Sequence, residues 1–248
     1  MMDIRTNEAP NALHGLRVAV TGGTSGLGRA LVREFREREA SVAFIARDHV
    51  RVAGVMREEP GTLGISGDVA DKHAIHPIAL QLLAWHGGLD VLVNNASSLG
   101  PAPLALLADT ECEDFERALA TNVLGPFRLT RALLGALAAS AREGRGSVVL
   151  NVSSDAAVTA YTRWGAYGAS KAALHQMSRI WDEECRDLRI RFLSIDPGDM
   201  DTPLHAAAVP DADRALLRSP GSAAREMVDA IVAALPARMP AASVEVRE

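Results

Sequence analysis

The stretch LRVAVTGGTSGLGRALV, residues 16–32, joins a short apolar run to a glycine-rich turn and then to a helical period. The turn places Gly22, Gly26 and Gly28 where the predicted strand passes into the predicted helix. Glycines at such a turn let the backbone approach a pyrophosphate, and the free N–H groups and dipole of the helix N-terminus favour its negative charge. The spacing differs from G-x-G-x-x-G, so a tight turn without a ligand stays open as an alternative.

The rest of the chain repeats the same strand-then-helix alternation. Strand-like runs lie at 16–21, 41–46, 62–66, 89–95, 146–154 and 190–198, and helical periods lie at 28–40, 48–59, 71–86, 110–140 and 164–188. Several of the strands are apolar on both faces, as in a sheet covered by helices on both sides. We therefore predict an α/β, Rossmann-like, doubly wound parallel sheet in a single domain.

The ends of the chain have a different character. Residues 1–14 are predicted to form a short polar leader, and residues 15–248 to form the single domain. The final SVEVRE, residues 243–248, has the alternation of a seventh strand.

Composition and charge exclude several classes of protein. The chain has 26 basic and 31 acidic residues, a formal charge of -5 and no tract dense in lysine or arginine, so a nucleic-acid partner is not expected. No signal peptide and no run of ~18 apolar residues is evident, which predicts no membrane association. Cys112 and Cys185 are far apart, which suits a reducing compartment, the cytoplasm. The seven histidines show no metal-ligand spacing, so no metal site is expected.

The segment YGASK, residues 167–171, places Tyr167 four positions before Lys171. On a helix these two side chains are neighbours on one face. An isolated pair of this kind is most often a solvated surface pair, so the spacing alone does not establish a site.

Six motifs in order resemble those of the short-chain dehydrogenases/reductases. They are TGGTSGLG (21–28), NNAS (94–97), TNVLGPF (121–127), Ser154, YGASK (167–171) and DPGDMDTP (196–203). The resemblance spans nearly the whole chain. It implies an oxidoreductase that transfers a hydride between a nicotinamide cofactor and a carbonyl or secondary alcohol of a small molecule.

The resemblance also implies four catalytic residues. Tyr167 would be the general acid/base, Lys171 its electrostatic partner, Ser154 the hydrogen-bond donor to the substrate oxygen, and Asn122 the support of a water-linked proton relay. Reduction of a carbonyl leaves an oxyanion that must be protonated, and an ammonium beside a phenol is expected to lower the phenol's pKa from its usual ~10.

The same resemblance implies the cofactor contacts. They would be Thr21, Gly22, Thr24, Ser25, Gly26, Leu27, Gly28, Asp68, Val69, Asn94, Ala96, Tyr167, Lys171, Pro197, Gly198 and Thr202. Ser97 stands where the family usually has a glycine, so close backbone approach is in question there.

The end of the second strand bears on the choice of cofactor. An acidic residue at this point binds a ribose 2′-hydroxyl, and a basic one pairs with a 2′-phosphate. The position holds Ala46 followed by Arg47, which predicts NADP(H), although Asp48 one step later keeps NAD(H) open.

Alternatives remain at the level of function. A nucleotide-sensing regulator with the same fold and no turnover is one, and an epimerase or dehydratase is a weaker one. The substrate pocket is expected to involve Leu99, Tyr161, Trp164 and residues 199–218. By resemblance, the helices at 110–140 and 164–188 would pair copies of the chain into a homodimer or homotetramer.

Overall fold

The computed structural model describes residues 13–236. Most of the predicted leader and the predicted seventh strand at 243–248 lie outside the described residues.

Six parallel strands form one sheet in the described part of the chain. They are β1 (Arg17–Thr21), β2 (Ser41–Ala46), β3 (Leu63–Ser66), β4 (Val91–Asn94), β5 (Ser147–Val152) and β6 (Ile190–Ile195). Their order is β3-β2-β1-β4-β5-β6, so the chain reverses its direction of travel across the sheet between β1 and β4. This arrangement confirms the predicted doubly wound sheet, and ligands of such sheets bind where the order reverses, at the carboxyl ends of the strands.

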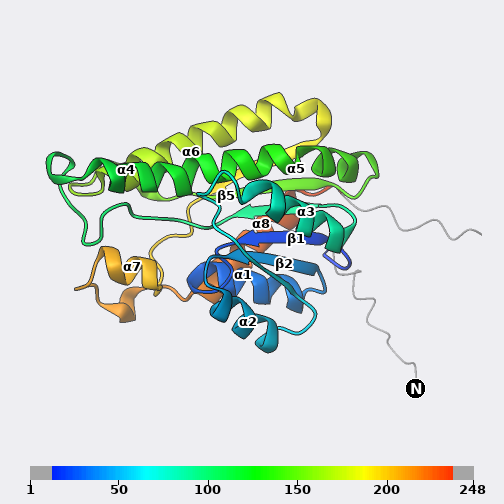
Figure 1. The fold of residues 1–248 in the computed structure, drawn as a ribbon, viewed down its shortest axis with the longest axis horizontal. Helices are drawn as coiled ribbons and strands as arrows, with labels where there is room; N and C mark the ends of the chain where they lie inside the picture. Colours follow the sequence, from blue (N-terminus) through cyan, green and yellow to red (C-terminus); the bar gives the residue numbers. More distant parts are fainter. Residues whose placement is uncertain (1–12, 237–248) are drawn as a thin grey trace, which may run out of the picture.

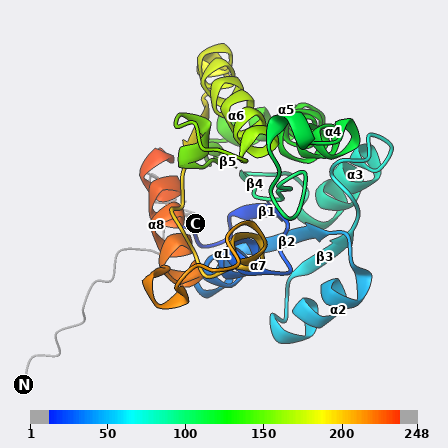
Figure 2. The ribbon, with the colours of Figure 1, turned by 90° about the vertical axis from the view of Figure 1, so that its left-hand side faces the viewer.

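Helices cover both faces of the sheet (Figures 1 and 2). They are α1 (Gly26–Glu37), α2 (His49–Glu58), α3 (Ile75–His86), α4 (Cys112–Leu119), α5 (Gly125–Arg142), α6 (Gly165–Glu184), α7 (Pro203–Ala208) and α8 (Pro220–Ala234). Side chains of α1, α2 and α8 pack with one face of the sheet, and those of α3 and α5 pack with the other. The strands read as apolar runs because both faces are buried.

Several helices differ from the sequence-based expectation. The helix predicted over 71–86 begins only at Ile75, because the Asp71 carboxylate accepts a hydrogen bond from the His73 N–H at 2.9 Å and holds a turn there. The helix predicted over 110–140 is α4 and α5 joined by a π-helical turn at Ala120–Leu124. Helices α7 and α8 were not among the predicted helices, although Ala223, Met227 and Ile231 give α8 a buried stripe.

A buried carboxylate ties the amino-terminal edge of the sheet together. Asp90, just before β4, is fully buried and accepts hydrogen bonds from the Arg17 guanidinium (2.6 and 3.1 Å) and from the Arg17 backbone N–H (2.7 Å). The Ser140 hydroxyl and the Arg145 guanidinium also donate to it. This cluster lies at the opposite edge from the carboxyl ends of the strands, so it serves the fold.

Candidate functional site

The glycine-rich turn packs too closely for side chains. Gly22 and Gly26 have positive φ values of 71° and 49°, which glycine adopts most readily. A Cβ added to Gly28 would lie 2.1 Å from the Gly22 carbonyl oxygen. Helix α1 can therefore begin directly against the turn, and its N-cap residue Ser25 makes no side-chain capping bond. The first-turn N–H groups are left available for an anion, as helix N-termini favour.

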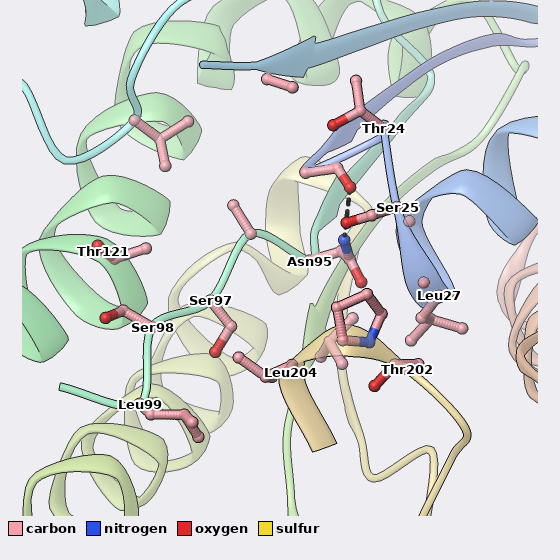
Figure 3. A pocket seen from close by; sticks show the side chains of 18 of the residues that line it. Thr24, Ser25, Leu27, Asn95, Ser97, Ser98, Leu99, Thr121, Thr202 and Leu204 are labelled. Carbon is pink, nitrogen blue, oxygen red and sulfur yellow. Dashed lines mark hydrogen bonds between the residues drawn. The ribbon is translucent and has the colours of Figure 1, made fainter. Parts of the chain in front are cut away.

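These groups face a cleft of about 550 Å³ at the carboxyl ends of the strands. Figure 3 shows Thr24, Ser25 and Leu27 on one side, Ser97 to Leu99 on another, and Thr202 and Leu204 beside them. The predicted cofactor residues that line this cleft are Gly22, Thr24, Ser25, Gly26, Leu27, Gly28, Arg47, Asp68, Val69, Ala96, Tyr167, Lys171, Pro197 and Thr202.

Three predicted cofactor residues do not line this cleft. The Thr21 hydroxyl is buried and accepts hydrogen bonds from the Asn95 and Ala96 backbone N–H groups, both at 2.9 Å. The Asn94 amide is buried between strands and donates to the Asn151 side chain at 2.8 Å. Gly198 lines an adjoining pocket instead. Thr21 and Asn94 are therefore buried beneath the cleft, where their side chains hold the neighbouring backbone and strands in place.

Tyr167 and Lys171 lie together on α6, as predicted. The Lys171 Nζ lies 5.5 Å from the centre of the Tyr167 ring and donates to the Val152 carbonyl on β5 at 2.7 Å. Small residues separate the pair because α6 packs closely here: a Cβ on Gly168 would lie 3.0 Å from the Ala156 carbonyl oxygen. Helix α6 therefore holds the Tyr167 phenol close to the turn after β5.

The expected lowering of the tyrosine pKa is wrong for this structure. Burial raises the pKa of Tyr167 to about 12, although hydrogen bonding with the Ser154 and Ser97 side chains acts in the opposite direction. Burial also lowers the pKa of Lys171 to about 8, against the attraction of Asp196. The free-energy cost of desolvating the phenolate and the ammonium is larger than the attraction between them. The phenol therefore holds its proton at neutral pH, the form needed to protonate an oxyanion.

Ser154 is held by its neighbour. Its hydroxyl donates to Asp155 Oδ1 at 3.0 Å, and Tyr161 donates to Asp155 Oδ2 at 2.7 Å. Hydrogen bonding between Ser154 and the Tyr167 phenol opposes the rise in the pKa of Tyr167 that burial causes. Asp155 is a residue that the sequence reasoning missed, because an aspartate after a strand is also an ordinary turn residue.

Asn122 lies in the π-helical turn, buried, and does not reach the cleft surface. Its Oδ1 accepts from the Ser98 N–H at 2.8 Å and from the Ser97 hydroxyl at 3.2 Å. Its Nδ2 donates to the Ser98 carbonyl and to the Ser170 hydroxyl, both at 2.8 Å. Asn122 therefore fastens the loop after β4 to α6, and Ser97 connects it to the Tyr167 phenol. The serine at 97, read in the sequence only as a departure from glycine, is part of the site.

A second pocket of about 520 Å³ adjoins the first. Leu99, Tyr161 and Trp164 line it together with much of 196–217. These three residues and 199–218 are the sequence-based candidates for the substrate pocket. The two pockets share Leu99, Ser153, Tyr167, Pro197, Met200, Thr202 and Leu204. They are two halves of one cleft, and the phenol stands at their junction.

Replacing Lys171 with methionine is expected to stabilise the fold. A lysine pKa lowered from 10.5 to about 8 represents a cost of about 3 kcal/mol for carrying the charge, and the lost hydrogen bond to Val152 offsets part of the gain. We expect the free energy of unfolding to rise by ~1–2 kcal/mol at pH 7. Because the folded-state pKa is depressed, the gain should be full below pH 8 and disappear as pH rises towards 10.5.

Thermal unfolding between pH 6 and pH 10 measures this effect. The exposed Lys72, the other lysine of the chain, provides the matched control, and Lys72→Met should leave the melting temperature unchanged. A lower melting temperature for Lys171→Met at pH 7 would contradict the prediction.

Cys112 and Cys185 are free thiols. No cluster of metal-binding side chains occurs within 13–236. No helix in that same range has the length and apolar character needed to span a membrane.

Comparison with known proteins places this site in a family. The family model for short chain dehydrogenases matches residues 17–213. An L-fucose dehydrogenase of Mus musculus is 33% identical over 192 residues, which are 77% of this chain and 67% of that enzyme. A short chain dehydrogenase of Pseudomonas syringae superposes with a TM-score of 0.82 at 28% identity over 92% of each chain. One from Streptomyces avermitilis has a TM-score of 0.76 at 29% identity, over 88% of this chain and 84% of that chain. The chain belongs to the short-chain dehydrogenase family and is an NAD(P)-dependent dehydrogenase that acts on CH–OH groups.

Proposed function

We propose that the protein transfers a hydride between NADP(H) and a carbonyl or secondary alcohol, with Tyr167 as the general acid/base. The observation that carries the proposal is the position of the buried Tyr167 phenol at the junction of the two halves of the cleft. A proton donor at this point can reach the oxygen of a substrate in one half while a cofactor in the other half exchanges the hydride.

The first half of the cleft fits a dinucleotide by its donor set. The uncapped first turn of α1 and the turn at Gly22–Gly26 suit a pyrophosphate. Asp68 and Val69 line the side near β3, and Lys171 and Pro197 line the side near the phenol. When bound, the nicotinamide supplies or accepts the hydride.

The chain's own residues handle the proton. The Tyr167 hydroxyl gives its proton to the developing substrate oxyanion in reduction and recovers it in oxidation. Ser154 orients that oxygen, and the Lys171 ammonium stabilises the phenolate that remains. Asn122 and Ser97 hold the loop that faces the phenol. We propose Ser154, Tyr167 and Lys171 as the groups that touch the reacting molecules, and Asn122 as a positioning residue.

Two observations favour NADP(H). Arg47 is exposed, lines the cleft, and forms no ion pair within residues 13–236. Asp48, which kept NAD(H) open, caps α2 through hydrogen bonds from the Val50 and Arg51 N–H groups at 2.9 and 3.1 Å. Its carboxylate is therefore engaged, whereas the Arg47 guanidinium is available to a 2′-phosphate.

Replacing Arg47 with alanine should weaken NADPH binding by ~1.5–3 kcal/mol, or roughly 10- to 150-fold, because a charge-assisted hydrogen bond to the 2′-phosphate is lost. NADH binding should change little. Fluorescence titration with both cofactors measures the two affinities. Arg57→Ala, on the following helix α2 but outside the cleft, is the control. An equal loss for NADPH and NADH would refute this role of Arg47.

The substrate is best sought among hydroxyl-bearing molecules, since a relative with 33% identity is an L-fucose dehydrogenase. A panel of sugars, secondary alcohols and carbonyl compounds, monitored by absorbance of the reduced nicotinamide, tests the proposed reaction. We also propose a homodimer or homotetramer paired through α5 and α6, which sedimentation velocity would measure.

A further inference from the structure

The two halves of the cleft carry opposite charges. The cofactor half is lined by Arg47, Arg51, Arg117 and Lys171, with Asp48 and Asp68 as the acidic side chains. The substrate half is lined by four carboxylates and by no lysine or arginine. These carboxylates belong to Asp155, Asp196, Asp199 and Asp213. The net charge of the lining side chains therefore changes from positive to negative along the cleft, at the Tyr167 phenol.

Neighbouring cations offset only part of the charge of the acidic half, because Arg218 is attracted by Asp196 as well as by Glu226. Arg214 pairs with Asp201 through bonds of 2.9 and 2.8 Å, and Arg218 pairs with Glu226 at 2.5 Å. Neither arginine lines the pocket. His205 is the basic side chain that does, and its Nε2 lies 3.7 Å from the Asp199 carboxylate. The pocket therefore has no unpaired arginine or lysine in its lining that could bind an anionic group of a ligand.

The negative field reaches the reacting centre. Asp196 acts to raise the pKa values of both Tyr167 and Lys171, which means that its charge is felt at the phenol. Clefts lined by charges of one sign concentrate ligands of the opposite sign and exclude those of the same sign. Carboxylate oxygens also accept hydrogen bonds from ligand hydroxyl groups.

We propose that the substrate half of the cleft excludes anionic molecules and selects an uncharged, hydroxyl-bearing substrate without a phosphate or carboxylate. This inference deepens the proposed function and rests on it, because the pocket selects a substrate only if the protein catalyses the proposed reaction. The charge of the pocket itself can be tested separately from turnover.

A thiol placed in the pocket measures its potential directly. Val209 lines the substrate half and is 37% exposed, so Val209→Cys in a Cys112→Ser background gives one accessible thiol, because Cys185 is buried. Cationic and anionic methanethiosulfonate reagents of similar size are compared by their rates of reaction. The ratio of the two rates cancels any effect of the pocket on thiolate formation.

The ratio of cationic to anionic rate should fall by about tenfold when Asp199→Asn and Asp213→Asn are combined in that background. The substitutions keep side-chain shape, and asparagine can replace Asp213 as the cap that accepts from the Ala215 N–H. The control pair, Glu184→Gln with Asp187→Asn, removes the same charge at the far end of α6 and should leave the ratio unchanged. Equal ratios in all three backgrounds would overturn the inference.

A second arm uses turnover. At low ionic strength a neutral sugar should have a kcat/KM about tenfold higher than the uronic acid that matches it, and the difference should shrink at 0.5 M salt, where screening is strong. A uronic acid turned over as well as its sugar would also overturn the inference. Absence of turnover with every compound would instead reject the proposed function, and the thiol ratios would still decide the charge of the pocket.

Discussion

Replacing Tyr167 with phenylalanine is expected to lower kcat by ~10²–10⁴-fold, the usual contribution of general acid–base catalysis. The substitution removes the transferable proton and keeps the ring, which packs edge-on against Trp164 with ring centres 5.6 Å apart. The affinity for NADPH should therefore stay nearly unchanged. Steady-state rates in both directions, together with a cofactor titration, measure the two quantities.

The chain offers a matched control for this substitution. Tyr161 is its other tyrosine, lines the same pocket and is 45% exposed, with a hydroxyl that donates to Asp155. Tyr161→Phe should lower kcat far less than Tyr167→Phe. A protein that binds NADPH tightly, yet shows no turnover dependent on Tyr167 with any compound of the panel, would favour the nucleotide-sensing regulator over the oxidoreductase.

Replacing Asp90 with asparagine should lower the free energy of unfolding by ~3–5 kcal/mol, because Arg17 and Arg145 would keep their charges beside an uncharged amide. For a chain of this size the melting temperature should drop by roughly 10 °C. Burial alone would raise the pKa of Asp90, but hydrogen bonds from Arg17 and Ser140 lower it to about 2. The folded-state pKa is depressed, so this contribution is present above pH 3.8 and is lost as pH falls towards 2.

Calorimetry at pH 7 and acid titration of the folded signal test this prediction. Glu37 is also paired with an arginine, Arg33, at 2.8 Å, but both side chains are about half exposed or more. Glu37→Gln should therefore cost no more than ~0.5 kcal/mol. Similar losses for the two variants would show that the buried network contributes no more than a surface ion pair. Cofactor affinity of the folded Asp90→Asn protein should be unchanged, since the cluster lies at the other edge of the sheet.

Local patterns in the sequence predicted most of the fold. All six strands, the parallel arrangement and the helix carrying Tyr167 and Lys171 were predicted, because doubly buried strands and helical faces leave their period in the residues themselves. The π-helical turn that buries Asn122 could not be predicted, since one extra residue in a helical turn changes no apolar pattern decisively.

The sequence by itself determined the six strands, most of the helices and the glycine turn, since each depends on spacing within one segment. Most of the side chains that meet in the cleft followed from the resemblance of six motifs to the family. Only the tertiary structure decided how those groups behave. Burial between α6 and the turn after β5 raises the pKa of Tyr167 and lowers that of Lys171, which the spacing of YGASK could not indicate. The acidic lining of the substrate half brings Asp155 and Asp213 into one pocket, although they lie nearly sixty positions apart in the sequence. Desolvation and electrostatic fields depend on all atoms that surround a group, and the chain brings those atoms together only when it folds.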